Sequence, residues 1–458
     1  EAEVSLPYGI SAKTIFGYDY IDNKEREFWA PSSVNGASLN GLGYRTDYTN
    51  KTMTSSTTLN YNGNFDKHNI RALVGYEIED RSLLLTVASA KSYSTDKLPE
   101  LANGQPYNVS SSTYGSSIMS VLANVNYDFD NKYYLSGSFR RDGSSRLGKN
   151  NRWANFWSVS GAWRISGEDF LSDNPLFSDL KLRASFGTNG NLPSDYYANL
   201  ATYSFGGGYG DASAIYWGSA GNSNLGWEKS KNFNIGIDWN LYNRVNVSLE
   251  YYDKTTTDLL FRVPTSYITG FSTNWQNLGK IKNNGVELTI GSTNIQTKDF
   301  TWTTDFNISF NRSKVLRIDG ENEYYQTSVS GGTNSSVLYR AIVGHSLGEM
   351  YGYKTNGVYT TDDFVQNGDK YVLKDGVIYQ KGSVKTQYKP GDIKYVNTTG
   401  QTDDKGTPVY NSDDMTVIGN ANPDFTGGFK NTFSYKGFDL SVFMVFSYGN
   451  DIFNMSTQ

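Results

Sequence analysis

The stretch "NFNIGIDWNLYNRVNVSLEYYDK" (232–254) decides the fold class, because two apolar-polar alternations flank a connection at 242–244. In the first segment, apolar residues at odd positions alternate with polar residues or Gly at even positions: Phe233, Asn234, Ile235, Gly236, Ile237, Asp238, Trp239, Asn240 and Leu241. In the second segment the order is Val245, Asn246, Val247, Ser248, Leu249, Glu250 and Tyr251. Period-two alternation is typical of a strand with one apolar and one polar face. The sequence therefore predicts an antiparallel hairpin whose apolar residues share one face.

The same alternation recurs along the chain, in thirteen or fourteen segments, and we find no convincing helical periodicity. Clear examples are 121–129 followed by 133–139, 156–166, 299–311, and 429–435 followed by 438–448. Within 232–251, the apolar set is expected to face lipid, with Ile237 at mid-bilayer depth, and Asn234, Asp238, Asn246 and Glu250 are expected to line a wet lumen.

The connections between these segments fall into two length classes. Tight connections at 130–132, 242–244 and 436–437 alternate with long ones at 83–115, 189–224, 253–278 and 320–427. Outer-membrane barrels combine short periplasmic turns with long extracellular loops, and they carry aromatic girdles near the strand ends. Backbone groups in lipid must be paired internally, so a closed barrel satisfies them. We therefore predict an all-β transmembrane antiparallel barrel; a soluble sandwich or propeller is the alternative.

Composition excludes several other classes. The 458 residues contain no Cys, so disulfides and thiolate metal sites do not arise. The net charge of −5 offers no polycationic surface, so nucleic acid is not expected as a partner. No run of about 18 apolar residues predicts a membrane helix. No signal peptide opens the sequence, and "EAEVSLPYGISAKTIFGYDY" (1–20) begins directly in strand-like residues.

Several strings in the sequence resemble one family closely. They are "RRDGSSRLGKNNRWANFWSVSGAWRISGEDFL" (140–171), "GWEKSKNFNIGIDWNLYNRVNVSLEYYDKTTTDLL" (226–260), "NLGKIKNNGVEL" (277–288), "FNISFNRSKV" (306–315) and "VIGNANPDFTGGFKNTFSYKGFDLSVFMVFSYGNDIFN" (417–454). In wording, order and spacing, from about residue 116 onward, they resemble the SusC/RagA-like family of TonB-dependent outer-membrane transporters.

The resemblance implies a 22-stranded barrel around an N-terminal plug, preceded by a TonB box. Residues 1–458 are expected to supply roughly 13–14 of those strands, with the plug and TonB box outside this sequence. The implied function is active import of an oligosaccharide or oligopeptide across the Gram-negative outer membrane. The implied partners are TonB, the lipid bilayer and a SusD-like surface lipoprotein. A passive porin or adhesin-type barrel is the alternative, and neither an enzyme activity nor a cofactor is expected.

The candidate substrate-binding residues are the aromatic residues crowded into one predicted loop, 189–224. They are Tyr196, Tyr197, Tyr203, Tyr209, Tyr216 and Trp217. Aromatic faces stack on sugar rings and also grip peptides. Docking of the SusD-like surface lipoprotein and packing within the loop itself explain such a cluster equally well.

One motif suggests a serine hydrolase, because Gly344-His345-Ser346-Leu347-Gly348 matches the G-x-S-x-G nucleophile elbow. The mechanism needs a His base that follows the Ser in the chain. The two His residues are His68 and His345, and neither follows Ser346. The motif is therefore interpreted as a coincidence within a loop, as the family resemblance also implies.

Other polar groups are weaker candidates for sites. Asp403, Asp404, Asp413 and Asp414 lie where family members often carry a calcium-like loop, but the alternating ligand positions are not in place, so a solvated loop is expected. His68 is expected to be a surface residue rather than a metal ligand. Arg140, Arg141 and Asp142 are expected to form an ion pair that packs a loop. Gly206-Gly207-Gly208 lacks the context of a phosphate-binding loop.

Overall fold

The computed structural model describes residues 1–453 except 172–173, 210–211, 319–322, 332–333 and 369. It gives the backbone alone for residues 207–209, 212–213, 264, 267, 323–331, 334–338 and 367. The chain forms two compact units: residues 1–243 with 254–278, and residues 244–253 with 279–458. Among the described residues, fourteen strands belong to the main sheet, which agrees with the thirteen or fourteen predicted.

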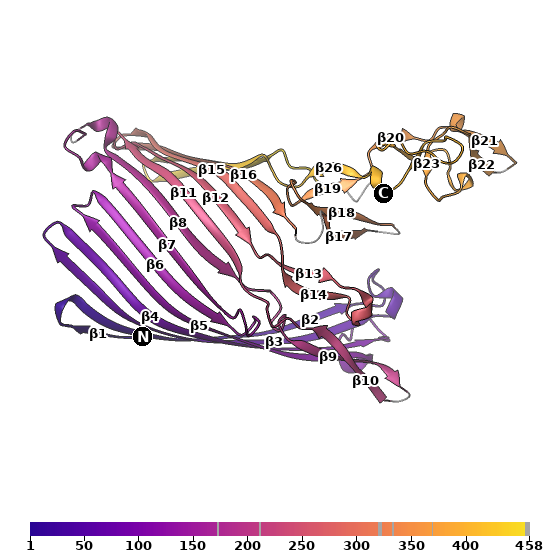
Figure 1. The fold of residues 1–458 in the computed structure, drawn as a ribbon, viewed down its shortest axis with the longest axis horizontal. Coiled ribbons are helices and arrows are strands. Elements are labelled where there is room, and N and C mark those ends of the chain that lie inside the picture. Colours follow the sequence, from indigo (N-terminus) through magenta and orange to yellow (C-terminus); the bar gives the residue numbers. More distant parts are fainter. Residues whose placement is uncertain (172–173, 210–211, 319–322, 332–333, 369, 454–458) are drawn as a thin grey trace. The chain divides into compact units, whose positions relative to one another are not determined.

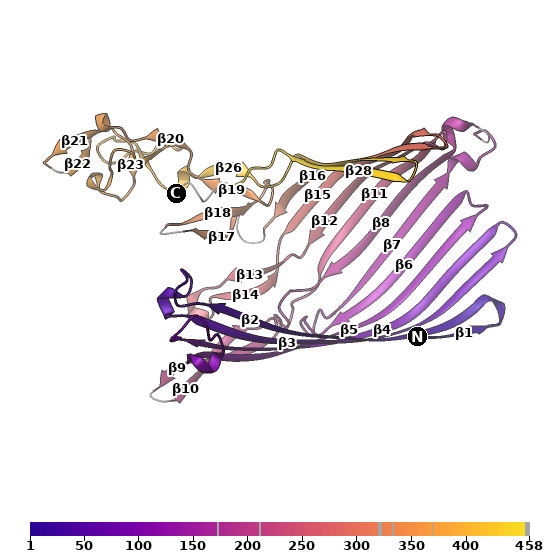
Figure 2. The same cartoon turned by 180° about the vertical axis from the view of Figure 1, so that it is seen from behind.

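Nine of these strands lie in the first unit, where each pairs antiparallel with the next (Figure 1). They are β1 (Ala2–Leu6), β2 (Ile10–Trp29), β3 (Leu42–Phe65), β4 (His68–Lys91), β5 (Gln105–Phe129), β6 (Tyr133–Ser144), β7 (Trp153–Arg164), β8 (Asp179–Asn191) and β11 (Glu228–Leu241). Two small hairpins follow: β9 (Ala201–Tyr209) with β10 (Ala212–Ala220), and β13 (Leu260–Pro264) with β14 (Thr273–Asn277). Both views place these hairpins at the strand ends away from the tight turns (Figure 2).

The second unit holds the remaining long strands, and β12 (Val245–Thr257) has residues in both units. The long strands are β15 (Lys280–Gln296), β16 (Phe300–Arg317), β27 (Phe425–Tyr435) and β28 (Phe438–Tyr448). The connection between β16 and β27 carries β17 (Glu323–Gly331), β18 (Asn334–Ile342), β19 (Glu349–Gly352), β20 (Thr355–Val358), β21 (Phe364–Asn367), β22 (Lys370–Leu373), β23 (Tyr379–Gln380), β24 (Ile393–Tyr395), β25 (Val409–Tyr410) and β26 (Thr416–Asn420).

Helical structure in the described residues is limited to 3-10 turns of three residues each. They are η1 (Pro7–Gly9), η2 (Ala37–Leu39), η3 (Leu101–Asn103), η4 (Ile165–Gly167), η5 (Pro175–Phe177), η6 (Tyr267–Thr269), η7 (Thr361–Asp363), η8 (Lys385–Gln387) and η9 (Ser412–Asp414). None of the described helices has the length and apolar character needed to cross a bilayer.

The three predicted tight connections are confirmed, and each contains two consecutive residues with positive φ. The pairs are Asp130-Asn131 (55° and 52°), Tyr242-Asn243 (52° and 53°) and Lys436-Gly437 (45° and 89°). Two positive φ values in succession define the type I′ turn, whose twist matches that of the flanking strands. The alternation on either side of 130–132 and of 436–437 therefore closes into hairpins, in which Phe129 pairs with Tyr133 and Tyr435 pairs with Phe438.

The long connections are shorter than predicted where strands extend past the alternating region. β4 continues to Lys91 and β5 begins at Gln105, so the predicted loop 83–115 reduces to 92–104. The other long connections of the main sheet are 192–227, 258–279 and 318–424. The tight-turn end also carries one longer connection that the sequence did not reveal, residues 165–178 with η4 and η5.

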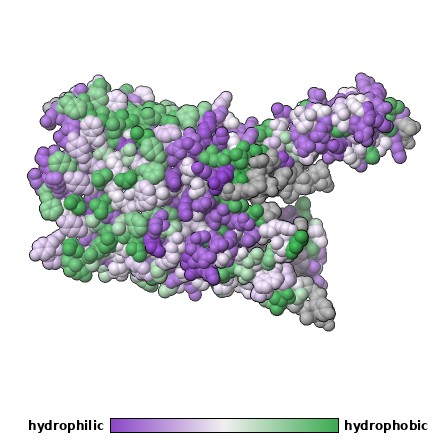
Figure 3. All heavy atoms as spheres, in the orientation of Figure 1, coloured by the Kyte–Doolittle hydropathy of each residue, from purple (hydrophilic) through white to green (hydrophobic). Residues whose placement is uncertain are grey.

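The two faces of the sheet differ in chemistry as the alternation predicts. Leu135, Val159 and Ile235 are 44–56% exposed, although they are large apolar residues within their strands. Their neighbours in sequence on the other face are polar, as Ser136, Ser160 and Asn234 illustrate. Figure 3 shows apolar residues gathered over the strands and hydrophilic residues toward the ends that carry the longer connections. An exposed apolar band of this kind suits lipid.

The register connects Ile237 with the girdle beside the tight turns. Ile237 pairs with Leu182, Leu182 with Trp163, and Trp163 with Tyr133, which directly follows the tight turn. The Tyr133 and Trp163 rings stack with their planes 11° apart, as expected of an interfacial girdle. Barrel strands are tilted by about 35–45°, so this row rises from the turn end at Tyr133 toward the bilayer at Ile237, which lies four residues before the end of β11. The mid-bilayer depth of Ile237 stays a prediction. The row that contains Val159 lies four residues farther from the tight turns than the row that contains Trp163, which is roughly 13 Å along the strand at about 3.3 Å per residue.

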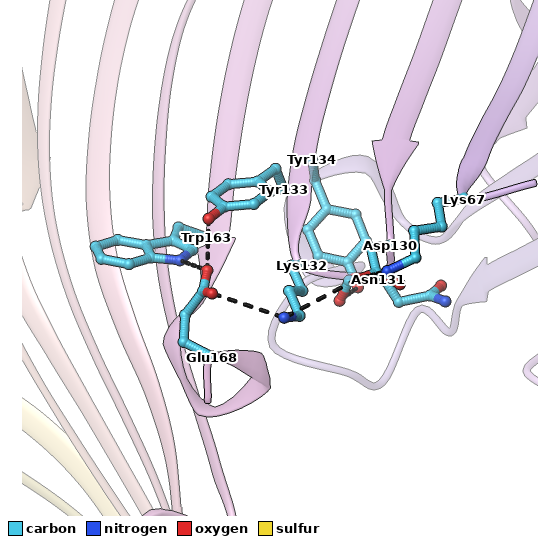
Figure 4. A network of polar contacts seen from close by, with 8 residues as sticks. All are labelled: Lys67, Asp130, Asn131, Lys132, Tyr133, Tyr134, Trp163 and Glu168. Carbon is cyan, nitrogen blue, oxygen red and sulfur yellow. Dashed lines mark hydrogen bonds and ion pairs between the residues drawn. The ribbon is translucent and has the colours of Figure 1, made fainter. Parts of the chain in front are cut away.

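A polar network ties three connections at this end together (Figure 4). Asp130 forms an ion pair with the Lys67 ammonium at 2.9 Å. The Lys132 ammonium lies between two carboxylates, 4.0 Å from Asp130 and 3.6 Å from Glu168. The hydroxyl of Tyr133 and the indole N–H of Trp163 also donate to Glu168, at 2.5 and 3.0 Å. These two donors are the main reason that the Glu168 pKa lies below its usual value. The network thus links the girdle aromatics to the charged rim beside them.

Candidate functional site

The connections at the other end of the first unit gather around a small apolar core. Its buried members are Leu147, Phe156, Ala198, Leu225 and Trp227. The core fixes both ends of 192–227, because Ala198 lies near its start and Leu225 near its end. The aromatic residues predicted to bind substrate therefore stand on a packed base.

Tyr196 and Tyr197 pack against the wall of the sheet. Both contact Tyr114 of β5, with ring centroids 5.4 and 6.2 Å away, and the Arg146 guanidinium lies 4.1 Å from the Tyr196 centroid. The Tyr197 hydroxyl accepts from the Gly115 amide at 3.1 Å. These contacts make the two tyrosines an anchor for the loop.

Tyr203 and Trp217 behave differently, because they form an exposed platform on the hairpin β9/β10. They pair across the hairpin and stack at 4.5 Å. Phe205 and Ile215 pair next to them on the same face and are 71% and 64% exposed. We call these four side chains the hairpin platform.

The two remaining predicted residues lie apart from the platform. Tyr216 pairs with Ser204, so it points to the opposite face of the hairpin, where it is also exposed. Tyr209 is the last residue of β9, and its side chain lies outside the described residues.

A cavity of about 280 Å³ lies next to the hairpin. Its charged centre is Asp195, which accepts from Arg262 at 3.0 Å and from the Trp275 indole at 3.4 Å. The Arg262 guanidinium lies 5.2 Å from the Trp275 ring centroid. The rest of the lining is mostly small and polar: Tyr197, Ala198, Thr202, Ser204, Gly218, Ser219, Gly221, Ser272, Thr273 and Asn274. The cavity combines one aromatic wall with an internally neutralised ion pair.

Sequence reasoning missed this cavity. Asp195 and Arg262 are 67 residues apart and share no local motif, so their pairing depends on β13 being brought beside the 192–227 loop. One partial signal for the cavity is present in the sequence, since Asp195 directly precedes the predicted binding residues Tyr196 and Tyr197.

Comparison with known proteins identifies the family. Residues 4–445 match the family described as TonB dependent receptor-like, beta-barrel. The chain belongs to this family. The TonB-dependent receptor P39 of Formosa agariphila is 33% identical over 480 aligned residues, which cover 98% of this chain and 44% of the relative. The TonB-dependent receptor SusC of Bacteroides thetaiotaomicron is 33% identical over 311 residues, covering 61% of this chain and 31% of SusC.

Solved structures agree with this family assignment. The structure of the RagAB peptide transporter matches with a TM-score of 0.76 and 28% identity, over 98% of this chain and 47% of that chain. The sequence thus spans less than half the length of the first relatives it matches. TonB-dependent receptors of this kind are outer-membrane barrels, so the apolar face of the sheet meets lipid and the polar face meets the lumen.

The elbow motif of this TonB-dependent receptor lies in the turn between β18 and β19. His345 Nδ1 pairs with a Glu349 oxygen at 2.8 Å. The Ser346 hydroxyl donates to the Leu347 carbonyl at 3.1 Å and accepts from the Asn422 amide at 2.9 Å. The hydroxyl therefore links the turn to Asn422 by a hydrogen bond. The receptor family is a transporter family rather than an enzyme family.

Replacing Ser346 by Ala should leave nutrient uptake and any ester hydrolysis unchanged, because the substitution removes only these local hydrogen bonds. A fluorophosphonate probe checks this directly on the wild-type protein. Labelling of Ser346 by the probe would contradict the structural interpretation.

The acidic run at 403–414 is held by hydrogen bonds to the Asp414 carboxylate and is not a solvated loop. We call these hydrogen bonds the Asp414 clip. Asp414 is fully buried and accepts from the Thr398 amide (2.7 Å), the Thr399 amide (2.8 Å) and the Asn411 amide (2.9 Å). The hydroxyls of Thr398 and Thr399 donate to it as well. The prediction of a solvated loop is therefore wrong for Asp414, whereas Asp404 and Asp413 are exposed. No group of three or more metal-ligating side chains was found among the described residues.

The other polar groups have structural partners. Arg140 bonds to Asp142 at 2.6 Å and to Glu77 at 2.9 Å, which confirms the ion pair, but both Arg140 and Asp142 lie within β6 rather than in a loop. His68 bonds to the Tyr127 hydroxyl at 2.8 Å at the start of β4. The Gly206-Gly207-Gly208 run lies within β9 of the hairpin platform.

Proposed function

We propose that this chain is the barrel portion of a TonB-dependent importer of large nutrients. The cargo is an oligosaccharide or an oligopeptide, and the importer works with a SusD-like surface lipoprotein. Relatives named TonB-dependent receptor and SusC, and the fold of the RagAB peptide transporter, support this proposal. The observation that carries it is the family match over 4–445 on a sheet with one lipid face and one polar face.

Energy has to reach such an importer from elsewhere. A lumen wide enough for an oligomer would leak if it were open, so a plug must occupy it between transport events. The outer membrane has neither ATP nor a sustained ion gradient to displace that plug. Work must therefore arrive mechanically from the inner membrane, at the end of the barrel that carries the tight turns.

The loop end of the first unit is where the cargo and the lipoprotein would meet the barrel. We assign cargo contact to Tyr203 and Trp217 of the hairpin platform, and to the neighbouring Asp195 cavity. Large exposed aromatic faces provide stacking surfaces, and convergent polar groups provide specificity. Tyr196 and Tyr197 are assigned to positioning this loop. Both rings contact Tyr114 of β5, Arg146 lies over the Tyr196 ring, and the Tyr197 hydroxyl accepts from the Gly115 amide.

Uptake by cells in which the whole transporter is the only route for a nutrient tests the proposal. Loss of TonB should abolish growth on that nutrient, and Trp217→Ala should weaken cargo binding while leaving barrel insertion intact. Gentle detergent extraction should also recover a lipidated partner at comparable abundance. Normal growth without TonB would reduce the protein to the alternative, a passive pore.

A further inference from the structure

Two cations stand on the lipid-facing side of the first unit. They are Arg141 of β6 and Lys231 of β11, and both side chains are exposed. Arg141 is two residues beyond the lipid-facing Phe139, and Lys231 is two residues before the lipid-facing Phe233. Because side chains alternate between the two faces along a strand, both cations point away from the lumen.

Both cations lie at the edge of the apolar band that is remote from the tight turns. Arg141 is eight residues from Tyr133 at the start of β6, and Lys231 is ten residues from Leu241 at the end of β11. At about 3.3 Å per residue and a strand tilt of about 35–45°, the cations stand roughly 19–27 Å above the tight-turn end. The apolar band of an outer-membrane barrel is about 25 Å tall. Arg141 and Lys231 therefore reach the level of the lipid headgroups on the loop side.

Two tryptophans lie between the cations. In the sheet order β7 and β8 separate β6 from β11 (Figure 1), and β7 carries Trp153 and Trp157 exposed on the same face. The Arg141 guanidinium lies 5.6 Å from the Trp153 ring centroid. Tryptophan is enriched at the headgroup level of membranes. We call these four side chains, Arg141, Trp153, Trp157 and Lys231, the Arg141 patch.

The charge of the patch is not balanced by the protein. Arg141 and Lys231 form no ion pair with any of the described residues. The tight-turn end differs, because there Lys132 lies between the carboxylates of Asp130 and Glu168. The excess positive charge at the loop side calls for an anion from outside the chain.

We propose that the Arg141 patch binds the phosphate groups of an anionic lipid headgroup in the outer leaflet. The guanidinium of Arg141 matches a phosphate with two parallel hydrogen bonds, and Lys231 supplies a second positive charge. Three strand spacings of about 4.8 Å separate the two cations, so both long side chains reach a headgroup seated over β7. The faces of Trp153 and Trp157 pack against its apolar part.

The position of the patch selects the bilayer as the occupant. A plug and a cargo occupy the lumen, which is on the opposite face of the sheet. In the sheet order, β1 to β5 lie on one side of the patch, and β12, β15, β16, β27 and β28 lie on the other. Strands added at either edge of the sheet would therefore remain remote from the patch. The neighbour of an outward-facing side chain at this level is a lipid headgroup.

A cross-linker placed in the patch can identify its occupant. Asn155 lies on β7, is exposed and pairs directly with Arg141. The whole transporter, otherwise cysteine-free, would carry Asn155→Cys labelled with a benzophenone. It would be placed in phosphatidylcholine vesicles that contain a small fraction of diphosphorylated or monophosphorylated lipid A. After illumination, mass spectrometry counts which lipid is attached.

Diphosphorylated lipid A should be cross-linked well above its share of the bilayer, and the monophosphorylated form less so. The double change Arg141→Gln and Lys231→Gln should lower this preference over phosphatidylcholine by roughly 25-fold, since each cation near an anionic membrane surface contributes a factor of about five. Lys298→Gln with Lys436→Gln is the matched control. It removes the same charge from exposed residues at the tight-turn end and should leave the preference unchanged.

Cross-linking in proportion to abundance, whatever the number of phosphates, would overturn the proposal. A preference that survives in the Arg141/Lys231 double variant would also overturn it. A cross-link to a second copy of the transporter, in place of lipid, would assign the patch to a protein interface instead. The assay needs neither TonB nor cargo, so its outcome is independent of the proposed import function.

Discussion

Replacing Val159 by Arg should destabilise the membrane-inserted barrel by about 2–4 kcal/mol, the penalty for a cation at the bilayer midplane of an outer-membrane barrel. Val159 is 44% exposed on the lipid face, four residues from the girdle row of Tyr133 and Trp163. Its neighbours in register are Gly137 and Phe186, which offer the guanidinium no counter-charge. The measurement is a urea titration of the whole transporter folded into lipid vesicles.

Leu241→Arg is the matched control, because Leu241 belongs to the same apolar set as Ile237 but is the last residue of β11, next to the tight turn 242–244. Near the interface the same substitution costs only about 0–1 kcal/mol, since the side chain reaches the headgroups. If Val159→Arg were as mild as Leu241→Arg, the face would not cross the hydrocarbon core as the alternation implies.

The second large effect is expected at Asp414, where Asp414→Ala should destabilise the segment 396–415 by about 3 kcal/mol. Removal of the carboxylate leaves the amides of Thr398, Thr399 and Asn411 without their acceptor, and a buried donor left unpaired costs about 1–3 kcal/mol. The effect should be local rather than global. Hydrogen exchange of 396–415 in the whole transporter measures it.

The exposed neighbour provides the control, because Asp413→Ala removes a carboxylate that accepts only from the side chains of Gln401 and Asn411. Its effect on exchange should be under about 1 kcal/mol. Equal effects for the two variants would show that the Asp414 clip does not hold the segment.

The clip should also respond to pH. Burial of Asp414 opposes its ionisation, but the hydrogen bonds from Asn411, Thr399 and Thr398 together hold its pKa below the usual value. A lowered folded-state pKa contributes stability above the unfolded pKa of about 3.9, and that stability is lost as pH falls through the folded value. Protection of 396–415 should therefore be constant near neutrality and should fall below about pH 4, but only in the protein that retains Asp414.

The sequence predicted the features that repeat locally. Period-two alternation in 232–251 is a property of neighbouring residues, so the hairpin, its turn at 242–244 and its two faces were predictable. The beginning of β5 was not, because Gln105–Ser117 is rich in Ser and Thr and shows no apolar alternation. Strands that extend beyond the membrane have no lipid on one side, so nothing imposes the pattern there.

Features that depend on distant residues were missed or misjudged. Asp195 meets Arg262 across 67 residues, because β13 lies beside the 192–227 loop. Of the six aromatic residues predicted to bind cargo, Tyr196 and Tyr197 pack on the sheet, whereas Tyr203 and Trp217 stand exposed. Their shared sequence context did not distinguish these roles, because tertiary packing decides them.

The central claim is that one face of this sheet meets lipid and the other meets a wet lumen. Spin labels placed one at a time from Asn232 to Trp239, in the whole transporter in outer membranes, test it most directly. Accessibility to oxygen should peak at 233, 235 and 237, and accessibility to a polar nickel complex should peak at 232, 234 and 238. A uniform profile, or one with the two sets exchanged, would contradict the account.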